Sequence, residues 1–155
     1  MSKSLKRVRQ ALSAAGLPDT TFEAGEARTA EQAAASCGCA LDQIVKSIIF
    51  AGQDSGAVRL FLTAGGNRVS ADKASQLAGE RLLRADGQLV RDTTGFAIGG
   101  VSPVGHLTPS PIWMDPRLMD FATVWAAAGT PRHVFSIDPQ VLMSLTQATI
   151  ADFVE

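Results

Sequence analysis

Apolar residues recur at helical spacing near the start of the chain and predict an amphipathic helix over 3–15. Gly16 and Pro18 follow where such a helix would end. The inward face carries four apolar residues: Leu5, Val8, Leu12 and Ala15. The opposite face is basic, with Lys3, Lys6, Arg7 and Arg9. These cations are either a solvated surface or contacts to phosphate.

The pattern then predicts a second helix and a β-hairpin. Thr29 and Gln32 have the capping-box spacing, so a helix should begin at Thr29, and Gly38 should end it. The segments 44–50 and 57–63 are rich in β-branched and aromatic residues, which favours two strands. The glycine-rich linker between them is typical of a hairpin loop.

In the second half of the chain, helical and strand patterns alternate. Predicted helices cover 71–78, after the cap Ser70, and the segment that begins at Asp138-Pro139 with Val141, Leu142 and Leu145 facing inward. Predicted strands cover 81–85, 111–115, 122–129 and 132–137, and 86–92 is a short helix or turn. Such a mixture predicts the α+β class, one domain over 1–155 with a mixed, largely antiparallel sheet and flanking helices.

Composition narrows the function classes. The chain has 155 residues, 14 Lys plus Arg and 15 Asp plus Glu, which argues against coating a long nucleic acid such as DNA. The charge balance does not exclude a protein that binds only the end of an RNA. No apolar run approaches the length of a membrane span and no signal peptide is recognisable, so we expect a cytoplasmic protein without a membrane partner. Cys37 and Cys39 make a weak metal site, and we expect inert thiols and no metal.

A lysine stands in an otherwise apolar strand. In "IVKSIIF" (44–50), strand alternation puts Lys46 on the same face as Ile44 and Ile48, and neither face looks solvated. The lysine could sit on an edge strand and reach out to water. Alternatively it could serve a site, as a Schiff-base lysine, a general base or an anion holder. The strand alone does not choose.

The least regular backbone of the chain is "TTGFAIGGVSPVGH" (93–106). Gly99 and Gly100 permit close approach of the backbone to another group, and Pro103 rigidifies the loop. Such a loop can aim N–H groups at a phosphate, a carboxylate or an oxyanion. By itself the pattern is weak, since most such loops are only connections and it matches no phosphate-loop motif.

The combination is more specific than its parts. The order of "IVKSIIF", "VSADKASQLAG", "DTTGFAIGGVSPVGH", "TVWAAAG" and a terminal Asp-Pro helix resembles the YbaK-type aminoacyl-tRNA deacylases, free-standing relatives of the editing domain of bacterial prolyl-tRNA synthetases. The resemblance covers about residues 5–154. It implies a curved sheet, removal of wrong amino acids from tRNA, typically tRNA for proline, and no metal or organic cofactor.

The resemblance also implies a site. Lys46 matches the family lysine, and Gly99 to Pro103 matches the family Gly-x-x-x-Pro motif. We therefore expect catalytic roles for Lys46, Gly99 and Gly100. The expected substrate-binding residues are Phe22, Val101, Ser102, Pro103, His106, Ala128 and Gly129. The loop N–H groups would polarise the ester carbonyl, the lysine would hold the 3′ end of the tRNA, and water would be the nucleophile.

Three local questions stay open in this prediction. Ser102 is more simply a turn hydroxyl than a nucleophile, because no elbow motif surrounds it. His106 could line the cleft or cap the loop, whereas we expect His133 on a strand surface. The run "AAAG" (126–129) suits a small side chain, and "GTPRHVF" (129–135) lacks the Gly-Lys-Arg-Gly run of the cysteine-removing branch, so alanine or 2-aminobutyrate is favoured over cysteine.

Other functions remain possible for such a sequence. The partners we expect are the acceptor end of aminoacyl-tRNA and, as a candidate, prolyl-tRNA synthetase. The first alternative is a module that binds a tRNA end or a synthetase without hydrolysing anything. The second is a hydrolase of another small ester or of a nucleotide conjugate, disfavoured because no strong nucleophile or metal site is apparent.

Overall fold

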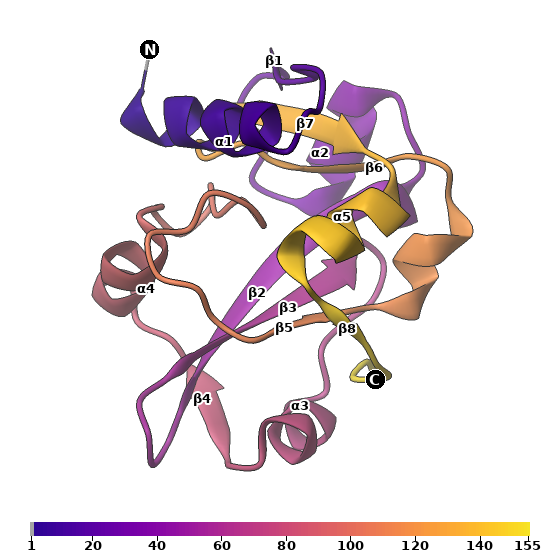
Figure 1. The fold of residues 1–155 in the computed structure, drawn as a ribbon. Coiled ribbons are helices and arrows are strands. Elements are labelled where there is room, and N and C mark those ends of the chain that lie inside the picture. Colours follow the sequence, from indigo (N-terminus) through magenta and orange to yellow (C-terminus); the bar gives the residue numbers. More distant parts are fainter. Residues whose placement is uncertain (1) are drawn as a thin grey trace.

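Five α-helices surround one sheet of eight strands in the computed structural model, which describes residues 2–155 (Figure 1). The helices are α1 (Lys3–Ala14), α2 (Ala30–Cys37), α3 (Ala71–Ala78), α4 (Gly87–Thr94) and α5 (Pro139–Thr146), with 3-10 turns at Leu41–Gln43 and Pro116–Asp120. The strands are β1 (Phe22–Glu23), β2 (Ile44–Gly52), β3 (Val58–Ala64), β4 (Leu82–Arg84), β5 (Ile112–Met114), β6 (Val124–Ala127), β7 (His133–Ile137) and β8 (Thr149–Ile150).

The sheet has the strand order β1-β7-β6-β2-β3-β5-β8, and β4 pairs with β2. Four strand pairs are antiparallel and three are parallel. The predicted α+β class with a mixed sheet is therefore confirmed. β2 is an interior strand: it pairs with β3 on one side, and on the other with β6 at its start and β4 at its end.

The two faces of the sheet have different tasks. Val45, Ala126 and Phe135 lie in one row of paired residues and belong to the main hydrophobic core, which α1 covers. The neighbouring positions Lys46 and Trp125 point to the opposite face by strand alternation. Further along that face, Phe61 anchors a second apolar cluster under α3. Lys46 thus lies on the face that the main core leaves uncovered.

Helix ends follow the capping signals of the sequence. The side chains of Ser2, Thr29, Ser70 and Asp138 each accept a backbone N–H bond at the start of a helix. Gln32 reaches back as a capping-box residue should, but its side chain accepts from the N–H of Arg28 rather than from that of Thr29.

Several predicted details are wrong. Ala15 is exposed, because α1 already ends at Ala14. Val141 is 36% exposed, since it lies at the rim of a groove beside α1, whereas Leu142 is fully buried. By contrast, the prediction of a short helix or turn over 86–92 is confirmed, because this segment forms most of α4. β1 and β8 were not predicted, because strands of two residues show no alternation.

Candidate active site

A cavity of about 290 Å³ lies on the uncovered face of the sheet. Its floor comes from β2, β6 and β7, one wall from the start of α2, and another from the glycine-rich loop. Among the residues that line it are Lys46, Gly99, Val101, Trp125, Ala127 and His133. The lysine and the loop, far apart in sequence, therefore converge on one cavity.

Lys46 is half-buried and held by a short network. Its ammonium group donates to the backbone oxygen of Asn67. The Asn67 amide donates to Asp115 at 2.8 Å, and the backbone N–H of Ala64 donates to the same carboxylate oxygen at 3.1 Å. Because β2 is interior and this network fixes the lysine, the edge-strand interpretation of Lys46 is wrong.

Burial sets the acid–base behaviour of Lys46. Desolvation lowers the pKa of Lys46 below its ordinary value, and Arg68 lowers it further. Glu31, Asp115 and Asp42 act in the opposite direction, because their negative charge favours the ammonium form. Lys46 lines the cavity, and a positive charge there is screened less than one at an open surface.

The loop presents only part of its backbone to the cavity. Gly99 has φ +95°, which favours glycine, and lines the cavity together with Val101. Within residues 2–155, the N–H groups of these two residues have no protein acceptor. The N–H of Gly100, by contrast, donates to Ala97 at 3.0 Å. A Cβ on Gly100 would lie 2.9 Å from the backbone of Thr130, so its role is close packing.

The structure places the rest of the loop away from the cavity. Ser102 is fully buried, and its hydroxyl accepts from the N–H of Val104 at 3.1 Å, as expected for a turn hydroxyl. His106 donates from Nε2 to the Ser102 carbonyl at 2.6 Å. His106 and Pro103 line a different cavity. Of the two roles left open for His106, the geometry matches the one that caps the loop.

Ala128 and Gly129 do not line the cavity either. The side chain of Ala128 is fully buried in the main core, because strand alternation turns it to the other face. Gly129 packs against α1, where an added Cβ would lie 2.8 Å from the Ser4 backbone. Ala127 takes their place in the wall. Phe22 is not among the lining residues, but its ring meets that of Trp125 edge-on at 5.5 Å.

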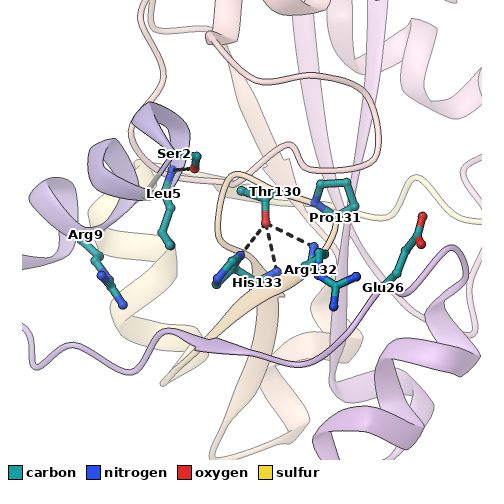
Figure 2. A pocket seen from close by; sticks show the side chains of 8 residues that line it. All are labelled: Ser2, Leu5, Arg9, Glu26, Thr130, Pro131, Arg132 and His133. Carbon is teal, nitrogen blue, oxygen red and sulfur yellow. Dashed lines mark hydrogen bonds between the residues drawn. The ribbon is translucent and has the colours of Figure 1, made fainter.

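The turn between β6 and β7 completes the site and was missed in the sequence. Figure 2 shows the Thr130 hydroxyl at the centre of this turn: it accepts from the backbone N–H groups of Arg132 at 3.2 Å and His133 at 3.1 Å. The same oxygen lies 2.7 Å from His133 Nδ1. We had expected His133 on a strand surface, but it lines the cavity of the candidate site. A Thr-Pro turn between two predicted strands was the only available signal.

The same turn also borders a second cavity of about 580 Å³. Ser2, Leu5 and Arg9 of the N-terminal segment face Thr130 and His133 across it (Figure 2). The turn is thus a shared wall between two hollows. Within residues 2–155 there is no cluster of three or more metal-ligating side chains, and no helix there is long and apolar enough to cross a membrane.

Comparison with known proteins identifies a family for this chain. A family model described as an aminoacyl-tRNA editing domain matches residues 24–145. The chain is 32% identical to YwhH of Bacillus subtilis, an uncharacterized protein, over 79% of this chain and 77% of YwhH. It is 24% identical to EbsC of Enterococcus faecalis, described as a candidate Cys-tRNA(Pro)/Cys-tRNA(Cys) deacylase, over 80% of this chain and 76% of EbsC. A crystal structure of a candidate trans-editing enzyme for prolyl-tRNA synthetase shares 45% identity and a TM-score of 0.92, covering 100% of this chain and 99% of that one.

Proposed function

The chain belongs to the aminoacyl-tRNA editing domain family, and we propose that it hydrolyses the ester bond of mischarged tRNA, with tRNA for proline as its substrate. The observation that carries this proposal is the convergence of Lys46, Gly99 and Val101 on one cavity. The protein would act in trans, in the cytoplasm, on tRNA that a synthetase has released. Prolyl-tRNA synthetase is a candidate partner.

The loop would stabilise the charge that develops on the ester. Attack of water on the ester carbonyl turns the carbonyl oxygen into an oxyanion. Gly99 and Val101 line the cavity, and within residues 2–155 their N–H groups have no protein acceptor, so these groups are the candidates to donate to that oxygen. We had expected the N–H of Gly100 to contribute as well. Its N–H already donates to the carbonyl of Ala97, and the close approach of Gly100 to Thr130 indicates a packing role instead.

Lys46 would hold the tRNA end. Its ammonium uses one of three donors on Asn67 and keeps the others for a phosphate or ribose oxygen of the terminal adenosine. Trp125 lines the cavity and contacts Phe22, which is 37% exposed, so an aromatic surface is available there for a base. Water is the nucleophile, and the collapse of the oxyanion releases the tRNA hydroxyl and the free amino acid.

The cavity favours a small amino acid. Ala30 and Ala33 of the α2 segment and Ala127 of β6 contribute only methyl groups to its wall. Such a surface accepts the side chain of alanine or 2-aminobutyrate, which we favour over cysteine. An apolar pocket separates substrates one methylene apart by only about 1–3 kcal/mol, so steric exclusion at the wall carries most of the selectivity.

A deacylation panel tests the proposal. Transfer RNA for proline is charged separately with alanine, 2-aminobutyrate, cysteine, serine and proline, and each species is incubated with the protein. We expect the alanyl and 2-aminobutyryl esters to be hydrolysed fastest and the prolyl ester to be spared. If no species is hydrolysed faster than in the protein-free control, the enzyme proposal fails. Tight binding of the same tRNA without hydrolysis would favour the binding-module alternative.

A further inference from the structure

We infer that Arg7, on helix α1, is a positioning residue that fixes the glycine-rich loop of the proposed deacylase site. The inference rests on the proposed function for its kinetic consequence. The sequence pattern had placed Arg7 in a basic helix face that is either solvated or bound to phosphate. In the structure the guanidinium group turns inward and forms hydrogen bonds with the loop.

Arg7 joins the two ends of the loop. Its Nε donates to the carbonyl of Gly105 at 2.9 Å, and its Nη2 donates to the carbonyl of Gly95 at 2.6 Å. One rigid guanidinium group thus ties together two backbone positions on either side of Gly99 and Val101. A guanidinium offers several donors in a fixed plane, which a lysine ammonium at one point cannot reproduce.

Ring contacts extend this clamp into the loop. The guanidinium carbon of Arg7 lies over the ring of Phe96, 4.6 Å from its centre. The Phe96 ring meets the His106 ring edge-on at 5.8 Å. His106 in turn donates to the carbonyl of Ser102. A continuous chain of contacts therefore runs from α1 to the residue that follows Val101.

The loop has a glycine at each end where its backbone lies close to Arg7. A Cβ on Gly95 would lie 2.4 Å from Arg7 Nη2, and Gly95 also has φ +81°. A Cβ on Gly105 would lie 3.2 Å from the carbonyl oxygen of Arg7. At both ends the loop backbone therefore approaches the helix more closely than a side chain would permit. The site residues Gly99 and Val101 lie between these two fixed points.

Loss of the clamp should misplace the loop N–H groups without removing them. A shift of about 1 Å at catalytic groups costs on the order of 10²-fold in rate. Because the affected groups act on the oxyanion, the loss should fall on kcat, while KM stays nearly constant. A residue that only attracted tRNA by its charge would raise KM instead.

Hydrogen exchange and steady-state kinetics of full-length variants test the inference. The variants are Arg7→Ala, Arg7→Lys and, as a matched control, Lys6→Ala, which removes an exposed charge from the same helix. In Arg7→Ala, the internally bonded amides of Phe96, Gly100 and Val104 should exchange on the order of tenfold faster or more, while the β2–β3 hairpin stays protected. On alanyl-tRNA, kcat should fall and KM should change little. Lys6→Ala should match the wild type in both measurements.

Arg7→Lys distinguishes the effect of the two hydrogen bonds of the guanidinium group from the effect of its positive charge. Lysine keeps the charge and most of the stem, so it should fold, but it can reach only one carbonyl and should show the faster loop exchange. This variant also decides the question if Arg7→Ala does not fold. The inference is overturned if Arg7→Lys restores wild-type exchange and kcat, or if loop exchange is unchanged in both variants. If the wild type hydrolyses no acylated tRNA, the proposed function fails, and the exchange comparison still decides whether Arg7 fixes the loop.

Discussion

The ammonium group of Lys46 donates a hydrogen bond to the main-chain carbonyl of Asn67. This bond ties the lysine to the turn that follows β3, and the turn is held by the buried carboxylate of Asp115. One carboxylate oxygen of Asp115 accepts from the backbone N–H of Ala64 and the side-chain amide of Asn67, and the other accepts from the backbone N–H of Arg117. The position of the lysine therefore depends on a residue that does not touch the cavity.

Asp115→Asn should weaken this support. An amide presents one NH₂ group where the carboxylate presents an acceptor, so at least one buried N–H loses its partner. Hydrogen bonds to charged groups contribute about 1.5–3 kcal/mol, and we expect a loss of that size in the free energy of unfolding. Urea unfolding measures it. Asp120→Asn is the control, because Asp120 is exposed, and a similar loss in both variants would contradict the role of Asp115.

Lys46→Met should abolish most activity without unfolding the protein. Methionine keeps the apolar stem and removes a partly desolvated charge, so the melting temperature should stay near the wild-type value or rise. Removal of one electrostatic contact of this kind costs on the order of 10²-fold in turnover. Lys3→Ala, on the exposed face of α1, is the control for charge. Unchanged deacylation by Lys46→Met would remove Lys46 from the site.

Gly99→Ala and Gly56→Ala form a matched pair. Both glycines have positive φ, +95° and +71°, and neither has an atom within 4 Å of an added Cβ. Backbone strain should therefore cost each variant about 1–2 kcal/mol of stability. Only Gly99→Ala should also lower turnover, by about 10²-fold, because Gly99 lines the cavity and its N–H is a proposed oxyanion donor. Equal activity in the two variants would argue against the oxyanion role of Gly99.

Ala127→Val should narrow the substrate range. The side chain of Ala127 lines the cavity, so two added methyl groups should exclude 2-aminobutyrate more strongly than alanine. The ratio of their kcat/KM values should shift toward alanine by a factor that corresponds to about 1–3 kcal/mol of transition-state free energy. Ala128→Val is the control, because its side chain lies in the core and should lower stability instead. A constant ratio in Ala127→Val would place the side-chain pocket elsewhere.

His106 should make stability depend on pH. Burial is the main cause that lowers the pKa of His106 below 6.5, so the folded protein binds fewer protons here than the unfolded chain. The free energy of unfolding should therefore fall as the pH drops below about 6.5, until the lowered pKa is passed. Unfolding between about pH 7.5 and 5.5 measures this slope, above the range where most carboxylates titrate. His106→Gln, which can still donate to Ser102, should flatten it, and an equal slope in both proteins would contradict the assignment.

Local signals in the sequence predicted much of the fold. Caps such as Thr29 and Ser70, the β-branched residues of β2 and the glycine-rich loop are each recognisable within a few residues of sequence. The errors arose where partners are distant. Ala128 was placed in the cavity because "AAAG" was treated as one surface, although strand alternation turns Ala128 away. Arg7 gave no local sign of its contacts, and the Thr-Pro turn was the only sign for His133, because both sets of contacts depend on how α1 and β7 pack.

The division of the sheet into two faces has a consequence for how such a protein can change. Ala127 and Ala128 are neighbours in sequence, yet Ala128 belongs to the core and Ala127 lines the cavity. Positions that pack in the core and positions that line the proposed site therefore alternate along the same strand. Substitutions can accumulate in one set while the other is conserved. Relatives that share this fold can therefore differ in the substrates that they accept.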